Sequence, residues 1–334
     1  MEKESKVIVI TPIKNEAWVL DLFLETCSVF ADAIILADQE SNDESIDIAN
    51  KFDKVIVVNN NSSSYDEALR QKLLIDKARD IFPNYKRILI ALDADEIIAY
   101  NGLDLHLWDE LRTYSYGTML YFEKPDLLPG LQRCVRWRDN YFYLGFVDNG
   151  DIHLGELIHS KRLPYSNDYA KVQVDSIKVL HLAHARTEAQ LSKLRYYSVI
   201  ENLKLTKPLY LRRLAYSPRS IDSVFAVNSK IELIEDSWMA DRGYSNNLHK
   251  AVEVISQYTW HDVFVLECFL RYGTKRFYLD NIWDYNWEDA LELCSTEIVS
   301  LKSLRIKRPP LLFKVYGSVI DIMYKTYLRI RNAC

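Results

Sequence analysis

Apolar positions in the first hundred residues follow two alternating patterns. Short runs rich in β-branched residues are apolar almost throughout, which is typical of strands covered on both faces. Between these runs the apolar spacing is helical, and Ser41 with Glu44 and Ser64 with Glu67 have capping-box spacing. Strand, helix, strand with short links predicts an α/β fold with a doubly wound, mostly parallel sheet. The strands are expected at residues 7–11, 33–36, 55–59 and 88–92, and the helices at residues 17–30, 43–52 and 65–81.

The pattern changes after Tyr100. Residues 113–174 are dense in aromatic residues and Arg, with frequent turn signals, and predict short antiparallel strands and long loops. An apolar run near Val179 leads into a helix expected over residues 187–205. The sequence therefore divides into a domain over residues 1–205, with halves 1–100 and 101–205, and a helical accessory region over residues 206–334. Helices of that region are expected at residues 229–240, 247–258, 261–272, 287–304 and 311–331.

Composition favours a folded chain in a reducing compartment. Apolar residues make up 49% and charged residues 27% of 334, with only 9 Gly and 9 Pro, so a packed core is expected. The 5 cysteines lie far apart without a C-x-x-C pair, which favours neither a disulfide framework nor a zinc site. No secretion signal or membrane-spanning stretch is evident, so we expect a cytoplasmic protein.

Charge is unevenly placed along the chain. The net charge is −5, but residues 302–334 hold eight Lys and Arg and one acid, so the remaining residues carry about −12. A mostly acidic body makes general nucleic-acid binding an unfavourable interpretation.

The sharpest chemical feature is the segment ILIALDADEII at residues 88–98. Strand side chains repeat every two residues, so Asp93 and Asp95 can project on the same side at the carboxyl end of the strand. Two carboxylates there suit Mg²⁺ or Mn²⁺, at the edge where open α/β sheets bind ligands. The alternative for this D-x-D sequence is a solvated acidic turn.

Residues 7–52 together with LDADE resemble the opening of a family 2 glycosyltransferase with the GT-A fold, and the resemblance extends over about residues 5–200. It implies that the domain over residues 1–205 has a nucleotide-binding half and an acceptor half. It also implies that Asp93 and Asp95 bind the metal and the diphosphate. Asn42 with Asp43 fills the turn after the second strand. The resemblance places these further residues around the nucleotide: Thr11, Pro12, Asn15, Glu16, Asp38, Asp43 and Arg70.

The segment VLHLAHARTEAQLSKLRYY also resembles a segment of such transferases. His181 stands where the family has a His after an apolar strand, and Lys193, Arg195 and Tyr196 fill the later basic and aromatic places. A neutral imidazole is a reasonable third metal ligand, and nearby cations can stabilise a departing diphosphate. His184 is a reserve candidate, and a structural histidine is the alternative for both.

Transfer with inversion, which the resemblance implies, needs a carboxylate base. Relatives often have a His-Glu pair in this region, whereas this chain has LGELIHS with Ser160 in the place of the Glu. Glu156 is the nearest acid and Asp151 the second candidate.

Two further features bear on the acceptor and on location. The aromatic residues of the loop region fit a groove for a sugar acceptor, with core packing as the alternative. They are Tyr121, Phe122, Trp137, Tyr141 and Tyr143. The helix expected at residues 311–331 is basic and amphipathic, so it could lie on the anionic inner face of a membrane or pack on its neighbours.

The sequence thus predicts a metal-dependent glycosyltransferase that moves a sugar from a nucleoside diphosphate donor to a hydroxyl acceptor. The acceptor expected is a glycan, a lipopolysaccharide intermediate or a lipid-linked intermediate. A haloacid-dehalogenase-type phosphatase and a non-catalytic sugar-binding module are the alternatives. In such phosphatases the nucleophilic Asp follows the first strand, whereas this D-x-D follows the fourth.

Overall fold

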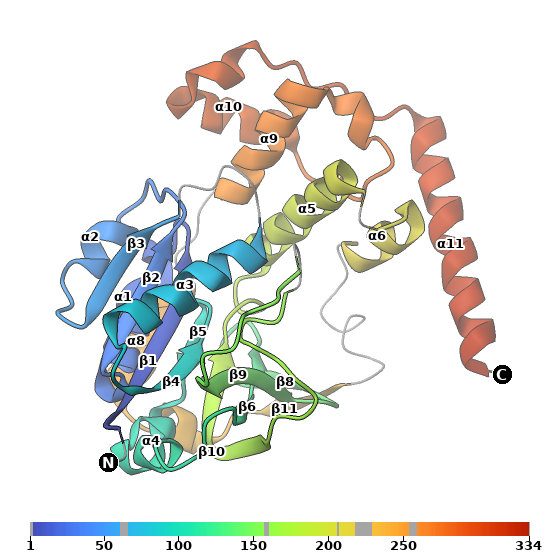
Figure 1. Cartoon of the computed structure of the whole chain (residues 1–334). Coiled ribbons are helices and arrows are strands. Elements are labelled where there is room, and N and C mark those ends of the chain that lie inside the picture. Colours follow the sequence, from blue (N-terminus) through green and yellow to red (C-terminus); the bar gives the residue numbers. More distant parts are fainter. Residues whose placement is uncertain are drawn as a thin grey trace. The chain divides into compact units, whose positions relative to one another are not determined.

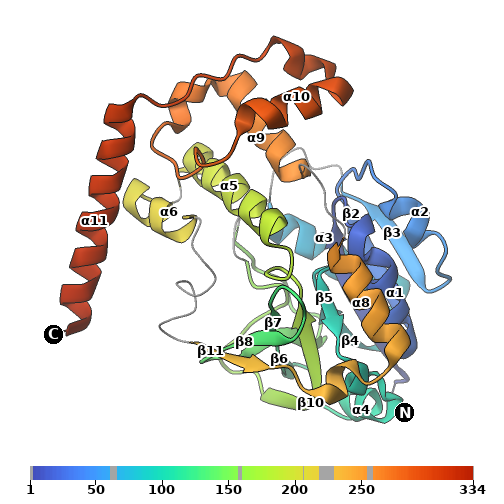
Figure 2. The same cartoon turned by 180° about the vertical axis from the view of Figure 1, so that it is seen from behind.

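A computed structural model describes residues 3–60, 66–156, 160–205, 207–217, 229–253 and 259–333 (Figures 1 and 2). The chain forms two compact units. Unit 1 comprises Met1–Arg186 and Phe225–Val254, and unit 2 comprises Thr187–Val224 and Ile255–Cys334. The predicted α/β fold class, with a C-terminal helical extension, is confirmed.

Unit 1 is built on one mixed sheet with the strand order β11-β8-β7-β10-β6-β9-β4-β1-β2-β3, and β5 pairs with β10. The first four strands are parallel to one another, as the sequence predicts, and the structure places them in the order β4-β1-β2-β3. The strands are β1 (Ser5–Ile13), β2 (Ala33–Asp38), β3 (Val55–Asn59), β4 (Lys86–Ala91), β5 (Glu96–Ile98), β6 (Met119–Glu123), β7 (Asp126–Leu127), β8 (Arg133–Trp137), β9 (Tyr141–Val147), β10 (Lys171–His181) and β11 (Ser229–Leu233).

Helices cover both faces of the parallel strands because successive strand residues point to opposite faces. Val7 and Val9 pack with residues of α1 and α8, whereas Ile8 and Ile10 pack with residues of α3. Figure 1 shows α3 in front of these strands, and Figure 2, seen from the opposite side, shows α1 and α8 in front of them. The helices of unit 1 are α1 (Ala17–Phe30), α2 (Ser45–Ala49), α3 (Glu67–Ile81), η1 (Tyr100–Leu103), α4 (Leu105–Leu111), η2 (Asp236–Met239) and α8 (Arg242–Glu253).

Two helix starts differ from the predicted capping boxes. The residue before α2 is Glu44, and Ser41 instead accepts a hydrogen bond from the backbone N–H of Asn15. Asp66 caps α3 by accepting the backbone N–H of Leu69, and Ser64 lies outside the described residues. The residues that precede α2 and α3 therefore lie three and two positions after the expected caps.

The chain returns to unit 1 where a helix was predicted over residues 229–240. That prediction was wrong, because residues 229–233 instead form strand β11, which pairs antiparallel with β8. The following α8 packs on α1, and the Tyr244 hydroxyl donates to the Ile98 carbonyl at 2.8 Å. The long-range partner of β11 overrides the local helical spacing.

Unit 2 is helical and has its own core around Phe269, Phe277 and Trp287. The buried Arg195 guanidinium of α5 donates to Asp262 of α9 at 2.9 Å, which fastens these two helices together. The division of the chain therefore differs from the predicted boundary at residue 205, because α5 belongs to unit 2. The helices are α5 (Thr187–Lys204), α6 (Leu209–Ala215), α9 (Trp260–Tyr272), η3 (Thr274–Phe277), α10 (Trp287–Glu297), η4 (Val299–Ser303) and α11 (Leu311–Ala333).

Candidate active site

The carboxyl ends of the parallel strands bring the predicted polar residues to one edge of unit 1. Asp38 at the end of β2 pairs in register with Ile13 of β1, and Asp93 follows β4 by two residues. The edge is therefore formed by the loops after β1, β2 and β4, where ligands bind in open α/β sheets.

Side-chain hydrogen bonds hold the first two of these loops together. Asn15, which has a φ of 55°, donates from its amide to Asn42 Oδ1 at 2.7 Å and accepts the backbone N–H of Asn42 at 2.8 Å. The Asp43 carboxylate accepts the backbone N–H groups of Ala17 at 3.0 Å and Ser45 at 2.9 Å. Asn15 and Asp43 thus fix the shape of the edge.

The other residues predicted around the nucleotide differ in their access to a ligand. Thr11 is fully buried within β1, and Pro12 is partly buried beside it. Asp38 is 8% exposed, and its carboxylate accepts the backbone N–H of Ser41. Glu16 accepts a hydrogen bond from the Trp18 indole at 2.8 Å. Asp38 and Glu16 therefore also lie at this edge of the sheet.

Arg186, which the sequence reasoning missed, lies beside this edge. Its guanidinium stacks over the Trp18 ring at 4.1 Å from the centroid. Burial lowers the pKa of Arg186, while the charges of Glu16 and Asp95 act in the opposite direction. A partly buried cation therefore lies within electrostatic range of both the first loop and the D-x-D segment.

Asp93 belongs to a charge cluster that is centred on Glu96. The Glu96 side chain is fully buried, accepts the backbone N–H of Asp93 at 2.9 Å and pairs with Lys124 at 2.8 Å. Arg162 donates to Asp93 Oδ2 at 2.5 Å and to both oxygens of Glu96. Burial by itself would raise the pKa of Glu96, but Arg162 and Lys124 hold that pKa well below its ordinary value.

His181 at the end of β10 lies between two carboxylates. Its Nδ1 is 2.5 Å from Asp126 Oδ1, and its Nε2 is 3.8 Å from Asp95 Oδ2. Oδ2 of Asp126 accepts the Trp137 indole N–H at 2.6 Å, and His184 Nε2 lies 3.8 Å from the same oxygen. Burial would raise the pKa of Asp126, yet the hydrogen bond and charge of His181 lower it, so the carboxylate is ionised at neutral pH.

An ionised carboxylate only accepts hydrogen bonds, so the short contact to Asp126 places a proton on His181 Nδ1. Nε2 is then the ring nitrogen that faces Asp95. A histidine whose other nitrogen is bound to a carboxylate is the usual arrangement of a metal ligand. The strands make this arrangement possible, because β10 pairs with both β5 and β7 at His181.

Asp95 and His181 lie close enough to form a candidate cation site. Among the residues that the structure describes, no three His, Cys, Asp or Glu side chains are grouped to hold a metal ion. Asp95 and His181 fit as a pair, because 3.8 Å is a separation that two ligands at about 2.1 Å from one ion can span. Asp93 is engaged with Arg162, so the two carboxylates of the D-x-D segment have different partners.

Arg70 and Lys193 lie on helices. Arg70 is on α3 and partly buried, one turn after Glu67, which accepts the backbone N–H of Ser160 at 2.9 Å. Lys193 is on α5, which belongs to unit 2.

The two candidate bases lie in different places. The exposed Asp151 accepts a hydrogen bond from Asn149 at 2.8 Å, and its carbonyl accepts Arg79, which pairs with Asp148. Asp148 in turn binds Arg87 at the start of β4. Arg87 precedes Asp93 by six strand residues, about 20 Å, so Asp151 is at the wrong edge of the sheet for a base beside Asp93.

Glu156 is at the matching edge of the sheet. Its backbone N–H donates to the Ser160 hydroxyl at 3.0 Å, and Ser160 is bound to the first turn of α3. Because α3 follows β3, this first turn lies at the carboxyl edge of the sheet. The Glu156 side chain is exposed, and residues 157–159 of LGELIHS lie outside the described part of the chain.

The aromatic residues that the sequence singles out divide into two groups. Tyr121 and Tyr143 line a cavity of about 400 Å³ together with Lys124 and Arg162. Phe122 is buried in the core, Tyr141 bonds to Asp175, and Trp137 bonds to Asp126. Only the first two therefore fit the predicted acceptor groove.

No protein-family model matches the chain, and no curated protein matches it. The solved structures that are similar include the following three. TarS of S. aureus has 14% identity and a TM-score of 0.36, with 83% of this chain and 54% of that chain covered. A 4-diphosphocytidyl-2C-methyl-D-erythritol synthase has 13% identity and a TM-score of 0.29, covering 44% and 71%. Glucosyl-3-phosphoglycerate synthase from Mycobacterium tuberculosis, in complex with Mn²⁺, UDP and glucosyl-3-phosphoglycerate, has 20% identity and a TM-score of 0.25, covering 37% and 44%. This chain spans about half the length of the TarS chain that it matches.

Proposed function

We propose that this chain is a nucleotide-sugar-dependent glycosyltransferase of the GT-A type. The observation that carries the proposal is the Asp126–His181–Asp95 arrangement at the carboxyl edge of the parallel strands, with Arg186 beside it. A divalent cation held by Asp95 and His181 would neutralise charge on a diphosphate. A phosphatase of the haloacid dehalogenase type fits less well, because β1 ends in Thr11, Pro12 and Ile13 without an aspartate.

In the proposed reaction, Glu156 accepts the proton of the acceptor hydroxyl while that oxygen attacks the anomeric carbon. The bond from the anomeric carbon to the diphosphate breaks, and the diphosphate leaves with the electron pair. Because attack is from the opposite side, the anomeric configuration inverts. Arg186 stabilises the negative charge of the leaving group electrostatically.

A panel of nucleoside diphosphate sugars tests this activity by release of the free nucleoside diphosphate, with Mn²⁺ or Mg²⁺ present. We expect turnover with at least one donor, and its loss in Asp95→Ala and Glu156→Gln. Asp151→Asn is the matched control, because its carboxylate lies at the other edge of the sheet. Turnover unchanged in Asp95→Ala would contradict the cation assignment, and turnover unchanged in Glu156→Gln would exclude that base.

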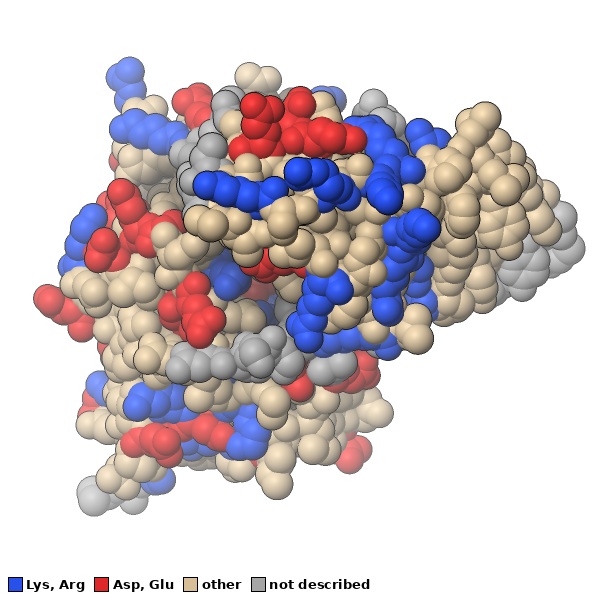
Figure 3. All heavy atoms as spheres, turned by 90° about the horizontal axis from the view of Figure 1, so that it is seen from above, with Lys and Arg blue, Asp and Glu red and all other residues tan. Residues whose placement is uncertain are grey.

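We further propose that α11 attaches the protein peripherally to an anionic membrane surface, such as the inner face of a bacterial membrane. None of the described helices is long and apolar enough to cross a bilayer. However, α11 exposes a row of large apolar side chains, and Figure 3 shows a mostly uncharged surface over this helix. The exposed Lys314 and Lys325 have no acidic partner among the described side chains. The apolar residues are Leu311, Leu312, Phe313, Val315, Tyr316, Val319, Ile322 and Met323.

Sedimentation with lipid vesicles tests the attachment. We expect binding to vesicles that contain anionic phosphatidylglycerol and much weaker binding to neutral phosphatidylcholine vesicles, since each basic residue contributes about 1 kcal/mol near an anionic surface. Ile322→Glu should abolish binding. Equal sedimentation of this variant and the wild type would exclude α11 as the attachment, and a concentration-dependent dimer that Ile322→Glu disrupts would instead identify a second copy as the partner of this face.

A further inference from the structure

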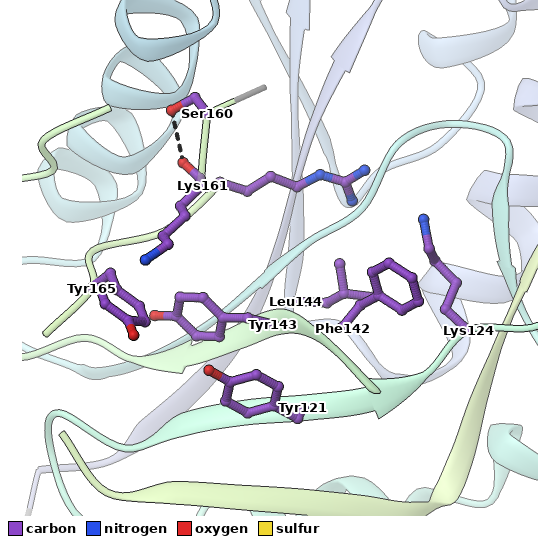
Figure 4. Close-up of a pocket in the computed structure, with 9 residues that line it drawn as sticks. Tyr121, Lys124, Phe142, Tyr143, Leu144, Ser160, Lys161 and Tyr165 are labelled. Atoms are coloured by element: carbon purple, nitrogen blue, oxygen red, sulfur yellow. Dashed lines mark hydrogen bonds between the residues drawn. The ribbon is translucent and has the colours of Figure 1, made fainter. Parts of the chain in front are cut away.

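The cavity beside the D-x-D segment is formed by β6, β9 and the loop that carries Arg162. Its volume is about 400 Å³. Figure 4 shows the tyrosines of the strands along one side and Lys161 on the other. The lining residues are Tyr121, Lys124, Phe142, Tyr143, Leu144, Ser160, Lys161, Arg162 and Tyr165.

Aromatic rings form an extended wall of this cavity. The rings of Tyr121 and Tyr143 stack with centroids 5.5 Å apart, and Tyr165 meets Tyr143 edge-on at 6.4 Å. The hydroxyl of Tyr143 donates to the Pro164 carbonyl at 2.6 Å, which fixes the ring. Such a wall provides apolar faces on which a saccharide ring can stack.

The lining carries three cations and no acid. Lys124 and Arg162 are neutralised from outside the cavity by Glu96 and Asp93. Lys161 is different, because no carboxylate among the described residues lies within ion-pair distance of it. Its ammonium instead lies 2.9 Å from the centroid of the Tyr165 ring, and Figure 4 shows the side chain directed toward that ring.

We propose that this cavity binds the acceptor and that the acceptor is a saccharide with an anionic substituent, a phosphate or a carboxylate. The saccharide stacks on Tyr121 and Tyr143, and Lys161 pairs with the anionic group. The assignment of the ligand as the acceptor rests on the proposed transferase function. It also follows from position, because Arg162 links the cavity to Asp93, which places the bound hydroxyl beside the proposed donor site.

Binding of small saccharides to the full chain tests the proposal by saturation-transfer NMR titration. The probes are methyl glucoside, methyl glucoside 6-phosphate and methyl glucuronide. We expect one or both anionic probes to bind up to about fivefold more tightly than the neutral one, which corresponds to one new exposed charge pair. The two anionic probes distinguish a phosphate from a carboxylate.

Lys161→Gln should abolish this preference, so that anionic and neutral probes bind about equally. The matched control is Lys171→Gln, which changes an exposed lysine at the start of β10 and should leave the preference intact. Tyr121→Leu should weaken binding of all three probes, because it removes one of the two rings on which the saccharide stacks. Equal binding of neutral and anionic probes by the wild type, or a preference that survives Lys161→Gln, would overturn the proposal.

Nucleotide binding measured on the same preparations separates this inference from the proposed function. If UDP and GDP bind but the anionic preference is absent, the cavity assignment fails alone. If the preference is present but no nucleoside diphosphate binds, the transferase function fails and, with it, the identification of the ligand as an acceptor.

Discussion

Asp126 shows how a single residue can determine the chemistry of its neighbours. It sits on the two-residue strand β7 and accepts hydrogen bonds from His181 and Trp137. Its negative charge fixes which nitrogen of His181 faces Asp95. Asp126 lies 55 residues before His181 in the sequence, in a segment whose only recognisable feature is a turn signal. The sequence alone therefore does not indicate this contact.

We predict that Asp126→Asn weakens Mn²⁺ binding by 10- to 100-fold, about the usual cost of losing a partner behind a metal ligand. An asparagine keeps the size of the side chain but removes the charge that holds the His181 tautomer. Electron paramagnetic resonance of free Mn²⁺ measures the affinity, with the exposed Asp168→Asn as the control. Equal Mn²⁺ affinity in Asp126→Asn and the control would contradict the role of His181.

Asp148 is a buried carboxylate at the edge of the sheet opposite to Asp93, and its charge is expected to stabilise the fold. Its side chain is fully buried and bonds to Arg79 at 2.6 Å and Arg87 at 2.8 Å. Burial acts to raise the pKa of Asp148, but the two arginines lower it overall. A lowered native pKa means that this carboxylate stabilises the fold above its unfolded pKa of about 3.9 and loses that contribution as the pH falls through the native value.

Asp148→Asn is therefore expected to lower the free energy of unfolding by about 3 kcal/mol at pH 7. The difference from the wild type should shrink as the pH falls below about 4, because proton uptake by Asp148 then favours the unfolded state, and it should be lost once the pH falls below the lowered native pKa. Thermal unfolding at pH 7 and at pH 3 measures both values. A difference that is the same at the two pH values would show that packing, and not charge, determines the effect.

At the scale of elements, strand β9 joins the parallel strands to the rest of the sheet. It pairs antiparallel with β4 on one side and with β6 on the other. Gly145 of β9 pairs with both neighbouring strands, and a Cβ atom on it would meet Leu120 Cβ and Phe122 Cε2 at 3.0 Å. Absence of a side chain lets β9 approach its neighbours and so positions Phe142, Tyr143 and Leu144 along the cavity.

Gly145→Ala is predicted to destabilise the protein by about 1–3 kcal/mol, because the added methyl group is too close to Leu120 and Phe122 of β6. Gly243→Ala is the control, since its Cβ would approach only the side chain of Asp241. Denaturant unfolding of both variants gives the comparison. Equal denaturant midpoints for the two variants would show that β9 and β6 can move apart enough for the methyl group with little loss of stability.

Elements with a strong local pattern could be predicted from the sequence, and those determined by distant partners could not. The helix at residues 17–30 and the strand at residues 55–59 match α1 and β3, because buried faces impose a regular spacing. By contrast, β11 forms only because β8 offers it an edge. The same holds in the site. Asp95 and His181 stand in recognisable segments, whereas Arg162 reaches Asp93 from 69 residues away.

At the scale of the whole molecule, the chain combines a unit that carries the proposed chemistry with a helical unit that ends in α11. The first includes residues 225–254, so the chain crosses between the units more than once. Removal of the C-terminal helical region at residue 205 would therefore also remove α8, which covers α1. A truncated variant that is meant to lose membrane attachment but keep sugar transfer should end after Pro310 instead.

The central claim is that the edge carrying Asp95 and His181 binds a nucleoside diphosphate together with a divalent cation. Isothermal titration of the full chain with UDP and with GDP, each with and without Mn²⁺, tests it most directly. We predict that at least one nucleotide binds, that Mn²⁺ strengthens its binding by at least about tenfold, and that Asp95→Ala removes this strengthening. Binding of neither nucleotide, or a Mn²⁺ effect that persists in Asp95→Ala, would contradict the account.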